Sequence, residues 1–193
     1  MTLLKEAGGH YEPEGTRAMF KTILVPTDGS KHAARAVTVA SDLAAKHGAR
    51  MVLLHVVSDD QLPEELARFA DNENLPRART ARNVERLEAT PHGPIPIAGG
   101  VQEQVDRHAV HFDIAERLLD SAKGVAQRCG VDKVEVATEQ GDPAERILER
   151  ARREQADGIV MGSRGLSDLK GALIGSVSHK VCHKADCTCI TVT

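Results

Sequence analysis

Short apolar runs alternate with longer segments of helical periodicity along most of this chain. Three runs, at residues 23–25, 51–57 and 159–161, are apolar at nearly every position. This pattern is typical of strands inside a parallel sheet, which are covered by helices on both faces. Two further predicted strands, at residues 133–138 and 187–192, alternate apolar and polar residues, so we expect them at the two edges of the sheet.

Helical segments separate the predicted strands. The first follows Ser30, a residue type that caps helices, and ends before Gly48, which favours a left-handed C-terminal turn. The second has apolar residues at helical spacing from Phe112 to Cys129, the third begins at Asp142-Pro143, and a fourth is expected over residues 176–184. The order predicts an α/β fold with a doubly wound, five-stranded parallel sheet of strand order 3-2-1-4-5.

Two parts of the chain depart from this alternation. Residues 1–18 are rich in glycine, proline and charge without an apolar period, so we expect a disordered N-terminal tail. Residues from about 58 to 105 combine a charged helical segment with a proline- and glycine-rich stretch, which we interpret as an insertion. The chain has 193 residues, and we expect a single domain over residues 19–193.

Composition argues against two classes of partner. The 25 Lys and Arg are balanced by 28 Asp and Glu, and the chain has no Trp, one Tyr and three Phe, so both the positive field and the stacking platforms of nucleic-acid binding are missing. No apolar run approaches the roughly 20 residues of a membrane span, and the N-terminus lacks the apolar core of a secretory signal. We therefore expect no nucleic-acid or membrane partner and a cytoplasmic protein.

Glycine and serine gather where the predicted strand order reverses, which is the ligand-binding point of such sheets. Pro26-Thr27-Asp28-Gly29-Ser30 follows one strand, Gly162-Ser163-Arg164-Gly165 follows another, and Gly175-Ser176-Val177-Ser178 opens the last helix. Glycine lets backbone N–H groups approach an anion, Ser176 and Ser178 offer hydroxyls, and the helix presents its positive end. This arrangement favours a polyphosphate ligand over the alternative that the glycines only close tight turns.

The spacing Gly-x2-Gly-x9-Gly-Ser, formed by Gly162, Gly165, Gly175 and Ser176, resembles the nucleotide motif of ATP-binding universal stress proteins. The segment Ile-Leu-Val-Pro-Thr-Asp-Gly-Ser at residues 23–30, the strand end Leu54-His55-Val56 and Gly141-Asp142-Pro143 are similar to the same family. The resemblance covers about residues 20–57 and 110–193 and implies a Rossmann-like fold of the adenine nucleotide alpha-hydrolase type.

The resemblance also implies a binding site for ATP. Adenine and ribose would lie near Pro26, Thr27, Asp28 and the backbone of Val56. The nucleoside pocket would also be lined by Gly141 and Met161. The phosphates would be held by Gly162, Arg164, Gly165, Gly175, Ser176, Val177 and Ser178. Mg²⁺ would accompany ATP through the phosphates and water. The family further implies a homodimer paired through the last strand, and the exposed edge expected at residues 189–192 independently predicts such pairing.

These features predict a nucleotide-dependent regulatory protein of the stress response. Because the chain has no Walker motif, we expect at most slow ATP hydrolysis or autophosphorylation at Ser176 or Ser178, and we assign Asp28 to binding and no residue to catalysis. Two alternatives remain open. One is a nucleotide hydrolase or transferase of the same fold group, and the other is a protein-interaction module that uses the insertion, whose position beside the crevice also suits a lid.

Histidine and cysteine cluster near the C-terminus. His179, Cys182, His183, Cys187 and Cys189 suggest zinc, but their spacing fits no standard closed site, and core packing of the cysteines is the favoured interpretation. Four cysteines in a chain without a secretory signal favour reduced thiols. Cys129 ends an apolar helical stripe and is expected in the core as well.

Overall fold

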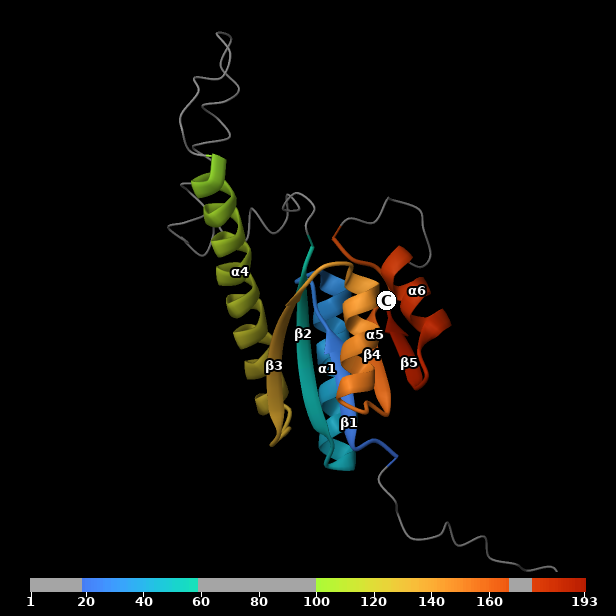
Figure 1. Cartoon of the computed structure of the whole chain (residues 1–193). Coiled ribbons are helices and arrows are strands. Elements are labelled where there is room, and N and C mark those ends of the chain that lie inside the picture. Colours follow the sequence, from blue (N-terminus) through green and yellow to red (C-terminus); the bar gives the residue numbers. More distant parts are fainter. Residues whose placement is uncertain (1–18, 59–99, 167–174) are drawn as a thin grey trace, which may run out of the picture.

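The structure, a computed structural model, describes residues 19–58, 100–166 and 175–193, with the backbone alone for residues 100–110. Within them, five parallel strands form one sheet in the order β3-β2-β1-β4-β5, which confirms the predicted fold class and strand order (Figure 1). The strands are β1 (Thr22–Pro26), β2 (Arg50–Val57), β3 (Val134–Gln140), β4 (Gly158–Gly162) and β5 (Thr188–Val192).

The central strand β1 is buried along its whole length, because β2 and β4 pair with its two sides. Ile23 marks the register, since its Cα is opposite Met51 of β2 and Gly158 of β4. The two alternating strands, β3 and β5, lie at the edges as predicted. Their bounds lie within two residues of the expected positions.

The first helix, α1 (Lys31–His47), begins and ends where its local signals predict. The Ser30 side chain accepts a hydrogen bond from the backbone N–H of Ala33 at 3.1 Å, which satisfies one of the unpaired donors of the first turn. At the other end Gly48 adopts φ 62°, a left-handed conformation that glycine reaches without a steric penalty.

The helix α4 (Gly100–Arg128) is longer than its predicted apolar stripe, because no glycine or proline interrupts residues 101–123. Its buried face is formed by Ile114, Ala115, Leu119, Ala122 and Ala126. Two predictions at the ends of the stripe are wrong. Phe112 lies at the margin of the buried face and is 44% exposed. Cys129 is also exposed, since it follows the last helical residue and the helical spacing no longer directs it inward.

The third helix, α5 (Pro143–Arg153), starts at the predicted cap: Asp142 accepts a hydrogen bond from the backbone N–H of Glu145 at 2.9 Å. The last helix, α6 (Ser176–Lys184), has the predicted bounds.

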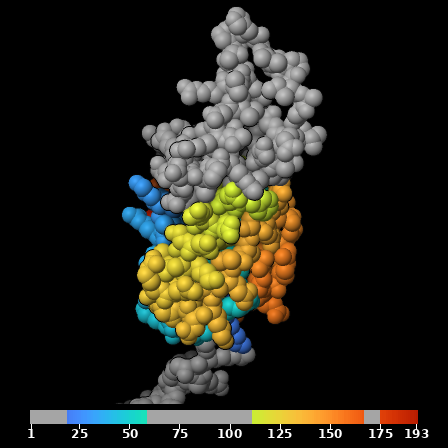
Figure 2. Space-filling model, turned by 90° about the vertical axis from the view of Figure 1, so that its left-hand side faces the viewer, coloured from blue at the N-terminus to red at the C-terminus, as the bar shows by residue number. Residues whose placement is uncertain are grey.

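The helices divide the core into two clusters, one on each face of the sheet. Residues Ile23, Val25, Met51 and Leu53 pack against α1 and α4, and the alternate residues Leu24, Val52 and Leu54 pack against α5 and α6. Figure 2 shows the flank formed by α4 (yellow) with β3 and α5 (orange) beside it. The two-sided cover explains why the inner strands are continuously apolar.

Candidate functional site

A cavity of about 180 Å³ opens where the carboxyl ends of β1 and β4 diverge from one another. The structure brings to it every residue of the predicted nucleotide site except Gly141: Pro26, Thr27, Asp28, Val56, Met161, Gly162, Arg164, Gly165, Gly175, Ser176, Val177 and Ser178. Gly141 follows β3, one strand farther out, and donates its backbone N–H to the carbonyl of Val57 at 3.0 Å. It is not among the described residues that line the cavity.

One end of the cavity is apolar. Its lining comprises residues of β2, α4 and α5, most of which were not predicted: Leu54, His55, Val57, His111, Ile114 and Ile147. Ile114 and Ile147 lie on the core-facing stripes of α4 and α5, so their helical spacing identifies them only as buried. That they also border a cavity depends on where the two helices cross the sheet.

His55 is a buried polar group at this end, with 5% of its surface exposed. Its Nδ1 atom lies 2.8 Å from the carbonyl oxygen of Thr27, and because a carbonyl only accepts, Nδ1–H is the donor. Burial lowers the pKa of His55, while the hydrogen bond to Thr27 and the charge of Asp28 oppose that shift. The imidazole is therefore neutral near pH 7, which leaves Nε2 as an acceptor.

The Asp28 carboxylate connects the two loops that meet at the cavity. Its Oδ1 accepts from the backbone N–H of Ser30 and its Oδ2 from that of Leu166, each at 3.0 Å. A Cβ on Gly165 would approach Asp28 Oδ2 to 2.6 Å, so glycine there allows the close approach of the second loop. Both carboxylate oxygens are thus engaged in holding backbone.

The other end of the cavity carries hydrogen-bond donors. Gly175 caps α6 without a side-chain hydrogen bond, whereas Ser30 and Asp142 cap α1 and α5 with their side chains. The first N–H groups of α6, from Ser176 onward, therefore keep their capacity to bind an anion, in addition to the positive end of the helix dipole. Arg164 adds a guanidinium whose buried Nε has no hydrogen-bond partner among the described residues.

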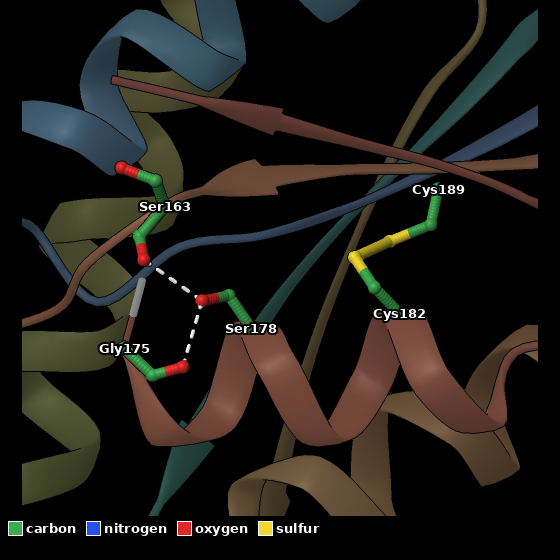
Figure 3. Close-up of a disulfide and its surroundings, with 5 residues drawn as sticks. All are labelled: Ser163, Gly175, Ser178, Cys182 and Cys189. Carbon is green, nitrogen blue, oxygen red and sulfur yellow. Dashed lines mark hydrogen bonds between the residues drawn. A yellow bond between two sulfur atoms is a disulfide. The ribbon is translucent and has the colours of Figure 1, made fainter. Parts of the chain in front are cut away.

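Ser178 forms hydrogen bonds to backbone. Its hydroxyl is buried and donates to the carbonyl of Ser163 at 2.8 Å, with the carbonyl of Gly175 as a second acceptor at 3.0 Å (Figure 3). A hydroxyl has one hydrogen, and in this structure that hydrogen is directed to backbone carbonyls, so a hydrogen bond from Ser178 to a phosphate stays a prediction. Ser176, by contrast, is exposed and lines the cavity.

Gly162 serves packing as well as the cavity wall. A Cβ there would lie 2.9 Å from the backbone of both His32 and Ala33, so only glycine lets β4 end this close to the first turn of α1. The alternative that this glycine has a structural purpose is therefore supported at this position. The spacing motif alone does not distinguish this packing role from an anion-binding one.

Ser163, to which sequence analysis assigned no specific role, anchors the loop after β4. Its N–H donates to the carbonyl of Val192 in β5, and its carbonyl accepts from Gly175 N–H, both at 2.7 Å. Its Oγ lies 3.0 Å from Nδ1 of His32. The loop that leads to the start of α6 is thus tied directly to the edge strand and to α1.

The C-terminal cysteines differ from their prediction. Cys182 and Cys189 form a disulfide, so the expectation of reduced thiols is wrong for this pair; α6 and β5 bring the two residues together, which spacing along the chain does not indicate. Cys187 is free and, like Cys189, packs against the core cluster that α5 and α6 cover, as the core-packing interpretation predicts. In the described part of the chain, no group of three or more His, Cys, Asp or Glu side chains is placed to hold a metal ion.

None of the helices within residues 19–58, 100–166 and 175–193 has the length and apolar character of a membrane span.

Comparison with known proteins gives consistent matches. The model of the universal stress protein family matches residues 19–193. The "Universal stress protein in QAH/OAS sulfhydrylase 3′region" of Thermus aquaticus is 34% identical over 174 residues, which cover 90% of this chain and 99% of that protein. Universal stress protein YxiE of Bacillus subtilis is 29% identical with the same coverage of both chains.

Solved structures share the fold. Universal stress protein UspA from Lactobacillus plantarum has a TM-score of 0.64 at 20% identity, covering 90% of this chain and 97% of its own. A universal stress protein in complex with cAMP has a TM-score of 0.55 at 21% identity, with coverages of 90% and 96%. A third, from Archaeoglobus fulgidus in complex with dAMP, has a TM-score of 0.51 at 17% identity, with coverages of 91% and 99%.

Proposed function

Because the chain belongs to the universal stress protein family, we propose that it binds ATP in the cavity between β1 and β4 and acts as a nucleotide-dependent regulatory protein of the stress response. The observation that carries this proposal is the two-ended character of the cavity. Apolar side chains and a neutral imidazole suit a nucleobase at one end, while uncapped helix N–H groups and Arg164 suit phosphates at the other. The cAMP and dAMP complexes of related proteins support an adenine nucleotide as the ligand.

Asp28 supports binding rather than rapid turnover. Its carboxylate holds the backbone N–H groups of Ser30 and Leu166, so Asp28 has a structural use as the link between the two loops. The phosphate end of the cavity presents mainly N–H donors and a cation, so Mg²⁺ would be held through phosphate oxygens and water rather than by a protein cage. Any hydrolysis or autophosphorylation would then be slow.

The proposal extends to the assembly and location of the protein. We propose a homodimer through the open edge of β5 and a cytoplasmic location, where ATP is available. The segment that connects β2 to α4 starts beside the cavity, since Ser58 lines it, and this supports a lid or a partner-docking role for the insertion. Residues 59–99 themselves lie outside the described residues.

Calorimetric titration with ATP and with adenosine tests the nucleotide site. Arg164→Gln removes the cation from the phosphate end, so ATP affinity should fall about tenfold, the equivalent of about 1.4 kcal/mol, while adenosine affinity stays within about twofold. Arg153→Gln is the matched control. Arg153 is an exposed residue of α5 that pairs with Glu139 of β3, and its substitution makes the same change of charge.

A second variant, Gly175→Val, places a branched side chain at the uncapped start of α6 and should weaken ATP binding further. If wild-type protein and both cavity variants bind ATP equally, or if none of them binds it, the proposed function is wrong. Phosphate release followed over hours separates regulation from catalysis, because turnover of about 1 s⁻¹ or more would identify an enzyme.

A further inference from the structure

The last helix and the last strand are joined covalently by the disulfide between Cys182 and Cys189 (Figure 3). Their Cα atoms lie 5.5 Å apart, a separation typical of a bridge between two packed elements. Cys182 lies one helical turn after Ser178, on the helix whose first N–H groups face the cavity, and Cys189 lies on the edge strand β5. The bridge therefore connects the anion-binding helix to the sheet.

The two cysteine residues differ in exposure. Cys182 is exposed, whereas Cys189 is half-buried and packs against the core cluster below α6. A small reagent in solution therefore reaches Cys182 first. Cys187 is a poor competitor for either sulfur, because burial raises the pKa of its thiol and keeps it protonated at neutral pH.

Among the described residues, α6 has a small buried face that packs against the core cluster it shares with α5. Of its nine residues only Ser178 and Val181 are buried. Lys180 pairs with Asp142 and Glu145 of the α5 region at 3.2 and 3.8 Å, but the Glu145 side chain is 62% exposed, and exposed ion pairs contribute little. The position of α6 consequently depends strongly on the covalent link to β5 and on the hydrogen bonds of Ser178.

We propose that Cys182 and Cys189 form a reversible redox site that exchanges with low-molecular-weight thiols and disulfides, and that the oxidised site holds α6 in the position that binds phosphates. The second part of this inference rests on the proposed nucleotide-binding function. The first part concerns the cysteine pair alone.

The exchange is balanced in electrons and protons. The Cys182 thiolate attacks a disulfide R–S–S–R, forms Cys182–S–S–R and releases one R–S⁻, which takes up a proton. The Cys189 thiolate then attacks the Cys182 sulfur and expels the second R–S⁻, which is also protonated. The two protein thiols are oxidised, R–S–S–R is reduced to two R–SH, and excess R–SH reverses both steps.

The test uses the full chain, oxidised with glutathione disulfide or reduced with dithiothreitol. Alkylation of free thiols followed by mass spectrometry should show one Cys182–Cys189 bridge after oxidation and none after reduction. Titration should show ATP binding about tenfold weaker in the reduced protein, with adenosine affinity within about twofold. Hydrogen exchange at the backbone amides of residues 176–184 should be faster in the reduced protein.

Matched variants separate the bridge from other effects of the reagents. Cys182→Ser/Cys189→Ser should behave like the reduced protein under both conditions. Cys129→Ser removes an exposed thiol at the far end of α4 and Cys187→Ser removes the neighbouring one, and both should retain the full difference between the two states. Loss of the bridge in Cys187→Ser would overturn the proposed pairing.

The two proposals fail in different ways. If ATP binds in neither state, the proposed nucleotide function is wrong, and alkylation and hydrogen exchange still decide the redox site. If glutathione disulfide does not produce the bridge, the redox proposal is wrong whatever ATP does. If the reduced protein binds ATP as tightly as the oxidised protein or more tightly, the proposal that the bridge strengthens phosphate binding is wrong.

Discussion

His55 shows how a single buried side chain makes the stability of this protein depend on pH. Burial lowers the pKa of His55 in the folded protein, whereas in the unfolded chain the residue titrates near pH 6.5. As the pH falls below about 6.5, the unfolded state binds a proton that the folded state does not, so the free energy of unfolding decreases. The loss from this residue is at most about 1.4 kcal/mol per pH unit and continues down to the folded pKa.

Denaturant titrations at several pH values between 5 and 7.5 measure this effect. His55→Asn is the informative variant, because an asparagine amide can still donate to the Thr27 carbonyl without titrating. We expect the stability advantage of the wild-type protein over this variant to shrink steadily as the pH falls. Parallel pH profiles for the two proteins would contradict the assignment of the effect to His55.

Gly162 is a position where one methyl group should be costly. A Cβ added at this position would clash with the backbone of His32 and Ala33, which cannot rotate away. Gly162→Ala should therefore lower the free energy of unfolding by about 1–3 kcal/mol. Gly124→Ala is the matched control within α4, where the nearest atom is the end of the flexible Arg128 side chain at 3.3 Å. That variant should gain about 0.5–1 kcal/mol from helix propensity, and equal effects in thermal denaturation would refute the packing role of Gly162.

At the start of α5, a local helix cap and an ion pair to another helix depend on the same residue. Asp142 caps its own helix through Glu145 N–H and also pairs with Lys180 of α6. The backbone hydrogen bond from Glu145, together with Lys180, lowers the pKa of Asp142. Asp142→Ala removes both interactions, whereas Asp142→Asn keeps a good cap and removes the charge.

We expect Asp142→Ala to cost about 1 kcal/mol in the free energy of unfolding. Asp142→Asn should cost less than half of that, because the ion pair is partly exposed and solvent weakens it. Chemical denaturation of the three proteins at pH 7 provides the comparison. A loss as large for asparagine as for alanine would show that the charge, and not the cap, is the important property.

For the whole molecule, the open edge of β5 determines the proposed assembly. Thr188 N–H and the Val192 carbonyl both point toward β4 or its flanking loops, as their bonds to Asp157 and Ser163 show. Because backbone groups alternate along a strand, the N–H of Thr191 points to the open side. Thr191→Pro should therefore remove an outward donor without breaking the β4–β5 pairing.

Light scattering tests this expectation. The wild-type chain should have the mass of a dimer, and Thr191→Pro should shift it to the mass of a monomer with an unchanged circular dichroism spectrum. Thr38→Ala, an exposed change on α1, is the control and should stay dimeric. A monomeric wild type, or a dimer that Thr191→Pro leaves intact, would exclude the β5 edge as the interface.

The amino-acid sequence by itself determined the strand order, the ends of α1, the start of α5 and the approximate place of the cavity, because these depend on periodicity and on caps formed by near neighbours. The tertiary structure decided which glycine is needed for packing, that the Ser178 hydroxyl binds backbone, and that Cys182 meets Cys189. Each of these depends on how separate elements approach one another in space. That approach is set by the packing of whole faces, which no local pattern encodes.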